Sequence, residues 1–227
     1  MPMKNGWQNE YIANTEIKEL AARLDQNDYD TCVEEIERLA KNKDWSIRQE
    51  LAIILNDHIN DHSIEILKKL ACDHSYIVQV EAIDTLQSIA DPDVEKIIRQ
   101  CMNSFHPLVR GYAYRYLCFN CDDEKELIKE FNTIEEKNTW ARIFLYIGMA
   151  QIGDSDKLLK LIRMYRRCYY LNQCAIVNGL ADIYSDLSKA NRTVVKQFVA
   201  LHYVEERPQS VDYAFNQLAR KCRMQKK

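Results

Sequence analysis

A helical pattern recurs three times in this chain with a spacing of 31 residues. Each copy begins with a branched apolar residue and continues with apolar residues four and eight positions later. The equivalent positions are Ile47, Leu51 and Leu55, then Val78, Ala82 and Leu86, then Val109, Ala113 and Leu117. A repeat of this length is typical of stacked helical units, each of which buries its apolar face against its neighbours. The chain is therefore predicted to fold as an α-solenoid.

The composition supports an all-α fold. The 227 residues include only 5 Gly and 4 Pro, which leaves few residues for the turns of a sheet. Apolar residues make up 47% of the chain, which is enough for a continuous core. No apolar run approaches the roughly 20 residues of a membrane-spanning helix, and Met1 to Trp7 lacks the apolar core of a signal peptide. These features predict a cytoplasmic protein without a membrane partner.

A second helix is expected after each repeated helix, because apolar residues recur there at spacings of three and four. These second helices are expected at 63–70, 93–102 and 123–131. Later pairs are expected from 141 to 162 and from 171 to 201, a divergent pair at 17–40 and a last helix at 210–222. The sequence thus predicts one domain over 1–227 with about six helical pairs. Its parts are a divergent pair in 1–41, repeats over 42–203 and a capping segment over 204–227.

A polar residue follows the first apolar residue of each copy: Arg48, Gln79 and Arg110. Asp73 precedes the second copy and Pro107 the third. In this pattern the chain resembles the HEAT-repeat family, especially the short bacterial repeats, over roughly residues 30 to 185. The resemblance implies a right-handed superhelix whose second helices line the concave side. Members of the family commonly bind protein or nucleic acid there.

Charge is unevenly distributed along the chain. Residues 1–139 contain 16 basic and 27 acidic residues, whereas residues 140–227 contain 15 basic and 7 acidic residues. The net charge of −3 therefore conceals an acidic N-terminal part and a basic C-terminal part. Because such fields govern encounter and partner choice, we expect a partner protein with an acidic patch that faces the basic half.

The basic residues concentrate in one expected second helix, which is expected on the concave side. Positions 157, 160, 163 and 167 are spaced so that their side chains fall along one stripe of that helix. Positions 192 and 196 would extend this ridge on the next second helix. The candidate partner-binding residues are Lys157, Lys160, Arg163, Arg166, Arg167, Arg192, Lys196 and Tyr165. The alternative interpretation is a solvated face whose tyrosines partly support the core.

The tyrosine-rich segment 112–119 supplies one more candidate contact. Tyr112, Tyr116 and Phe119 share one helix face and are expected to pack between helices, whereas Tyr114 points elsewhere. Tyr114 is therefore expected to be exposed, where an amphipathic ring can anchor a partner.

The cysteines and histidines form no recognisable catalytic or metal-binding motif. The 8 cysteines are scattered, and we interpret them as reduced thiols that serve as small core residues. The C-x-x-C from Cys118 to Cys121 lacks a second pair of ligands at zinc spacing. His58 and His62 are four residues apart, but an expected turn separates them. The sequence predicts no cofactor, no metal and no enzymatic activity.

The favoured function is a non-catalytic adaptor, scaffold or regulatory binder that holds another protein on its concave face. Nucleic acid is an alternative, because basic residues near aromatic rings bind single strands, but the pI near 6.0 argues against it. A HEAT-like alkylpurine DNA glycosylase is a further alternative. Its central helix requires aspartate four residues after a tryptophan, and neither Trp45 nor Trp140 has one. A bilin-lyase-like subunit remains as an alternative by fold analogy.

Overall fold

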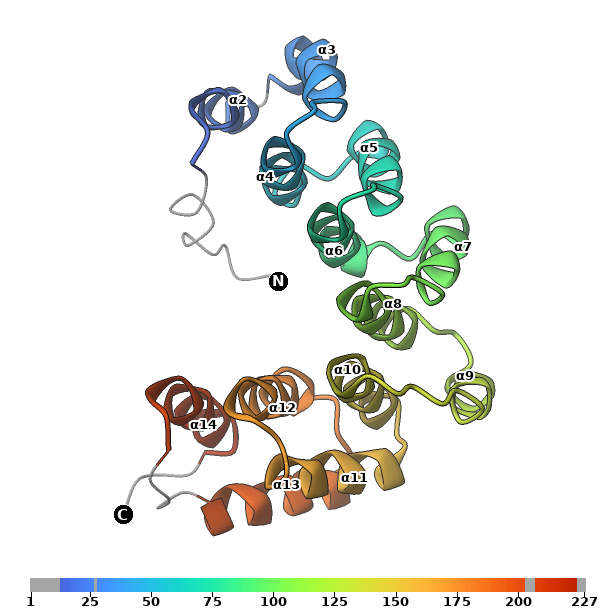
Figure 1. Ribbon diagram of the computed structural model, residues 1–227, viewed down its shortest axis with the longest axis vertical. Coiled ribbons are helices and arrows are strands. Elements are labelled where there is room, and N and C mark those ends of the chain that lie inside the picture. The colour runs from blue at the N-terminus through green and yellow to red at the C-terminus, as the bar shows by residue number, and fades with distance from the viewer. Residues whose placement is uncertain (1–12, 27, 203–206, 224–227) are drawn as a thin grey trace. The chain divides into compact units, whose positions relative to one another are not determined.

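The computed structural model describes residues 13–26, 28–202 and 207–223, and it contains no strand within these ranges. Figure 1 shows successive helices joined by short loops. Their contacts divide the chain into two compact units, one that ends at Val109 and one that begins at Arg110. The all-α prediction is confirmed for the described part of the chain. The expected absence of a signal peptide falls on Met1 to Trp7, which lies outside the described residues.

The first unit is built from helix pairs. The pairs are α2 (Thr15–Leu24) with α3 (Tyr29–Leu39), α4 (Trp45–Leu55) with α5 (Asp61–Ala71), and α6 (Tyr76–Thr85) with α7 (Pro92–Cys101). A short 3-10 turn, Leu86–Ser88, follows α6. The first helices α2, α4 and α6 pack side by side in one layer, and α5 and α7 contact each other in the other.

The second unit continues the alternation, and the boundary between the units falls inside α8. The helices are α8 (Pro107–Phe119), α9 (Glu124–Phe131), α10 (Thr139–Gln151), α11 (Ser155–Tyr165), α12 (Tyr170–Ile183), α13 (Lys189–His202) and α14 (Gln209–Lys221). Within this unit α10, α12 and α14 pack side by side, and α11 and α13 contact each other in a second layer. Six pairs and a last helix are thus present among the described residues, within a few residues of the predicted bounds. No described helix is both long enough and apolar enough to cross a membrane.

Aspartate and asparagine side chains fix where many of these helices begin. Asp91 accepts hydrogen bonds from the backbone N–H groups of Asp93 and Val94, and Pro92 occupies the first helical position of α7. Aspartate or asparagine caps α2, α4, α5, α9, α10 and α11 in the same way. Helices α7 and α8 begin at prolines, Pro92 and Pro107, whose fixed φ suits the first helical position.

The 31-residue register marks positions in the core. The equivalent residues Leu51, Leu55, Ala82, Leu86, Ala113 and Leu117 are all buried. The first register residue is buried at Val78 and Val109 and half-buried at Ile47. The sequence pattern therefore identifies side chains that fill the same place in successive helix pairs.

The arginine that follows the first register residue binds a carboxylate in the loop before the next first helix. Arg48 donates from Nε and Nη2 to Oδ2 and Oδ1 of Asp73, at 2.6 and 2.8 Å, and both side chains are buried. Asp73 also accepts a hydrogen bond from the backbone N–H of Ser75 (2.7 Å). Burial alone would raise the pKa of Asp73, but the bonds from Arg48 and Ser75 hold it below its usual value. We call this pairing the repeat clamp.

A second repeat clamp lies in the second unit. Arg110 donates from Nε and Nη2 to the two oxygens of Glu136, at 2.8 Å each. Glu136 accepts a further bond from the backbone N–H of Asn138 at 2.9 Å. As at Asp73, burial opposes ionisation, yet the bonds from Arg110 and Asn138 lower the pKa of Glu136. In both units the clamp ties a first helix to the N-terminus of the next first helix.

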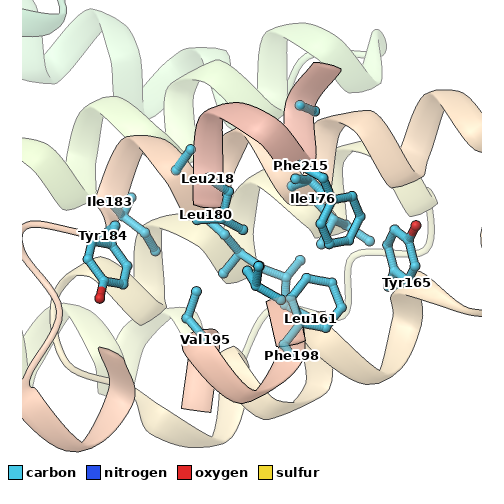
Figure 2. Close-up of a cluster of buried hydrophobic side chains, with 14 of the residues drawn as sticks. Leu161, Tyr165, Ile176, Leu180, Ile183, Tyr184, Val195, Phe198, Phe215 and Leu218 are labelled. Atoms are coloured by element: carbon cyan, nitrogen blue, oxygen red, sulfur yellow. The ribbon is translucent and has the colours of Figure 1, made fainter. Parts of the chain in front are cut away.

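The core of the second unit gathers side chains from α11, α12, α13 and α14 (Figure 2). Tyr165 meets the rings of Phe198 and Phe215 edge-on, with centroids 5.3 and 5.5 Å apart. Leu180 and Leu218 are fully buried beside them. Aromatic and aliphatic packing of this kind fixes α11 against α13 and so determines the surface between them.

Candidate functional site

Helix α11 carries most of the basic residues that the sequence groups into a ridge. The helix begins after a turn at Gly153, whose φ of +105° favours glycine, and it ends at Tyr165. Arg166 is therefore the C-cap, and Arg167 lies in the turn that leads to α12. The predicted stripe from 157 to 167 is helical only as far as Tyr165.

Three arginines at the end of α11 are exposed. Among the described residues, Arg163, Arg166 and Arg167 make no ion pair. Lys160 differs, because its ammonium lies 2.8 Å from the Asp156 carboxylate, and that hydrogen bond raises the pKa of Lys160. The three arginines are thus the cations of α11 with the most freedom to bind an external anion.

Lys157 does not lie on the exposed ridge. It is only 9% exposed, and its Nζ lies 5.4 Å from the centroid of the Tyr146 ring on α10. This is a cation–π contact between two helices of the same unit. Lys157 is thus not part of the exposed stripe that the sequence predicts, because the first turn of α11 packs against α10.

The two tyrosines predicted as contacts are both buried. Tyr165 lies at the centre of the aromatic core, because it follows Leu158 and Leu161 on the inner face of α11. Tyr114 is 3% exposed and donates from its hydroxyl to Glu136 Oε2 at 3.1 Å. Burial, followed by the nearby carboxylate, raises the pKa of Tyr114 to about 12.

The face of α8 that the sequence assigns to the core is also only partly correct. Tyr116 is buried and Tyr112 is half-buried, but Phe119 is 51% exposed. Tyr114 is buried because α8 buries more than one face, whereas Phe119 is exposed at the last residue of the helix. A single-face pattern therefore misplaces both Tyr114 and Phe119.

Arg192 and Lys196 are exposed on α13 but do not extend the ridge of α11. Arg192 donates from Nε to the backbone carbonyl of Leu187 at 2.8 Å, and its charge acts on Tyr184. Lys196 acts on Cys222 at the end of α14. Their positions, two and six residues before Phe198, place them on the opposite flank of α13 from the residues that face α11.

An open groove of about 530 Å³ lies between α11 and α13. On the α11 side it is lined by Ile162, Arg163, Arg166 and Arg167. On the α13 side it is lined by Val194, Gln197, Phe198, Leu201 and His202. The groove therefore combines three cationic side chains on one wall with an apolar floor. We call it the α11–α13 groove.

The apolar floor was not anticipated from the sequence. Phe198 forms its base and also belongs to the core, while Leu201 stands at its rim and is 62% exposed. The only signal is the width of the apolar stripe on α13, where 194, 198 and 201 run alongside the core positions 195, 199 and 202. Single exposed leucines are common on protein surfaces, so this signal becomes meaningful only beside the arginines.

Comparison with known proteins gives no relative: no family model matches the chain, and neither does a curated protein or a solved structure. In the described part of the chain, no group of three or more His, Cys, Asp or Glu side chains is arranged to hold a metal ion. The α11–α13 groove is thus the feature of the described residues that bears most directly on function.

Proposed function

We propose that this chain is a non-catalytic, HEAT-like α-solenoid that binds another protein through the α11–α13 groove. The observation that carries the proposal is the meeting of Arg163, Arg166 and Arg167 with an apolar floor. Apolar surface supplies binding free energy, and unpaired arginines supply orientation and bidentate recognition of carboxylates. An acidic patch on the partner complements this surface.

The charge of the second unit supports an acidic partner. The unit that begins at Arg110 contains 20 basic and 14 acidic residues, whereas the unit that ends at Val109 contains 11 and 20. A positive field around the groove accelerates encounter with an acidic protein and disfavours basic ones. The eight free thiols fit a reducing compartment, and we place the interaction in the cytoplasm.

Capture of a partner from native cytosol tests the proposal. We expect the wild-type chain to retain a protein in a salt-sensitive manner, and Arg163→Glu/Arg167→Glu to weaken retention by about tenfold or more. The matched control is Lys189→Glu/Lys196→Glu, which makes the same charge change on exposed residues outside the groove. Thermal unfolding of both variants should match wild type, because solvated charges contribute little to stability.

Two results would count against this function. A partner that is retained equally by wild type and Arg163→Glu/Arg167→Glu would show that the arginines are only a solvated face. Sequence-independent binding of single-stranded or duplex DNA, lost in the same variant and steeply salt-dependent, would instead identify a nucleic-acid-binding protein.

A further inference from the structure

The α11–α13 groove is long enough to bind a short helix. Its α13 wall consists of residues one or two turns apart, from Val194 through Phe198 to Leu201. At 1.5 Å per residue the seven steps from Val194 to Leu201 span about 10 Å, which corresponds to about two turns of a bound helix. Since the described residues contain no strand, the groove offers no sheet edge to an extended peptide.

The two walls of the groove differ in chemistry, and this difference sets the pattern of the occupant. Val194, Phe198 and Leu201 line the α13 wall at spacings of four and three residues, which suits apolar side chains at the same spacings on a bound helix. The α11 wall presents guanidinium groups from Arg163 and Arg167. A helix in this groove would place leucine-like side chains toward α13 and carboxylates toward α11.

We propose that the α11–α13 groove binds an acidic amphipathic helix of the partner protein. This inference rests on the proposed function and adds the class of ligand. The acidic face of the bound helix would lie against Arg163 and Arg167, and its apolar face would pack on the floor of the groove. Exposure of Leu201 is explained because its side chain is a rim contact that the helix covers.

A designed peptide provides the direct test. The probe is a fluorescein-labelled 16-residue helix with leucines at spacings of three and four and glutamates along one flank. Its binding to the full chain is measured by fluorescence anisotropy. We expect saturable binding, at least about tenfold weaker for a scrambled sequence and for a version with glutamine in place of glutamate.

Variants of the full chain locate the peptide. Leu201→Ser should weaken binding at least about fivefold, because an apolar contact is lost from the rim. The matched control is Leu159→Ser, since Leu159 is an exposed leucine of α11 (39%) that does not line the groove. Arg163→Glu/Arg167→Glu should abolish the preference for glutamate over glutamine, and Lys189→Glu/Lys196→Glu should retain it.

Several outcomes would overturn the inference. Absence of saturable binding below about 1 mM, or equal binding of the scrambled peptide, would remove the acidic helix as ligand. Binding of decanoate without binding of the peptide would identify a site for anionic amphiphiles.

The inference and the proposed function fail in different ways. If the cytosolic partner is lost on reversal of Arg163 and Arg167 but is retained by Leu201→Ser and is not displaced by the peptide, protein binding stands and the helical ligand is wrong. If no partner responds to the charge reversal while the peptide binds as expected, the groove recognises an acidic helix, and the cytosolic capture does not depend on it.

Discussion

At the scale of single residues, the repeat clamps separate what a sequence pattern can predict from what it cannot. The register predicts the place of Arg48 and Arg110 and the burial of the residues around them. It does not predict their acceptors, which are an aspartate in one unit and a glutamate in the other. The two carboxylates differ by one methylene, and only the geometry of the loop brings each within reach of its arginine.

Ala113 gives the simplest test of the register. It is fully buried in α8 at the position equivalent to Leu51 and Ala82. We expect Ala113→Asp to lower the free energy of unfolding by about 3–5 kcal/mol, because it buries a carboxylate without a partner. Urea denaturation measures the change. Ala200→Asp is the control, since Ala200 is exposed on α13, and an equal loss in both variants would contradict the register.

The Arg48–Asp73 clamp should make stability depend on pH. We expect Asp73→Asn to lower the free energy of unfolding by about 3–5 kcal/mol near neutral pH, because the buried Arg48 loses its counter-charge. The exposed residue Glu34 provides the control, as Glu34→Gln makes the same charge change on the surface of α3.

The direction of the pH effect follows from the lowered pKa of Asp73. A carboxyl whose folded pKa is depressed adds stability above its unfolded pKa, about 4, and this stability disappears as the pH falls through the folded pKa. The gap between wild type and Asp73→Asn should therefore be widest near neutral pH and shrink below about pH 4. A gap that stays constant down to acid unfolding would show that Asp73 does not titrate as described.

At the scale of helices, the sequence pattern predicts where each helix lies along the chain more accurately than it predicts which face of the helix is exposed. The stripe from 157 to 163 identified α11 as basic, and three arginines do line a groove. Arg192 and Lys196 were misplaced because the side of α13 that meets α11 depends on the packing of Phe198, which no single-helix pattern contains. Lys157 and Tyr114 were misplaced because a helix with neighbours on two sides buries more than one stripe.

The contact between α8 and α10 depends on a glycine. A Cβ added at Gly148 would lie 2.7 Å from Sγ and 3.0 Å from Cβ of Cys118, so the two helices approach too closely for a larger residue. We expect Gly148→Ala to destabilise the chain by about 1–3 kcal/mol through overpacking.

A double-mutant cycle tests whether Cys118 is the cause. In a Cys118→Ala background the thiol is absent, and Gly148→Ala should cost less, with a coupling of at least about 0.5 kcal/mol by urea denaturation. Strict additivity of the two changes would show that the backbone, and not the thiol, limits the space.

At the scale of the whole molecule, the 31-residue period predicted the alternation of helices along the chain, and the composition predicted the all-α class. All eight cysteines are free thiols, half of them buried, and burial raises the pKa of Cys101 to about 12. A raised thiol pKa suppresses the reactive thiolate, which agrees with cysteines that serve as small apolar residues.

Thermal unfolding of the whole chain should therefore be indifferent to reductant and to chelator. We expect the same Tm with dithiothreitol, with EDTA and with neither, measured by circular dichroism. A Tm that falls with dithiothreitol would reveal a disulfide, and one that falls with EDTA would reveal a structural metal.

The repeat clamp also determines which 31-residue segment can be deleted without separating Arg48 from Asp73. Deletion of residues 44–74 removes Arg48 together with Asp73, so no charged partner is left behind. In the shortened chain Gln79 occupies the register position that Arg48 held. The helix of Gln79 keeps the loop that already follows it.

A deletion of equal length over residues 60–90 has a different consequence. It keeps Arg48 but removes Asp73, and the register now places Ser104 where the carboxylate stood. The two shortened chains have the same number of helices and nearly the same apolar content. Only the second, however, leaves the buried Arg48 without its carboxylate partner. A deletion that starts just ahead of a first helix should therefore leave the shortened chain folded, whereas one that starts between the two helices of a pair should leave Arg48 buried without its carboxylate.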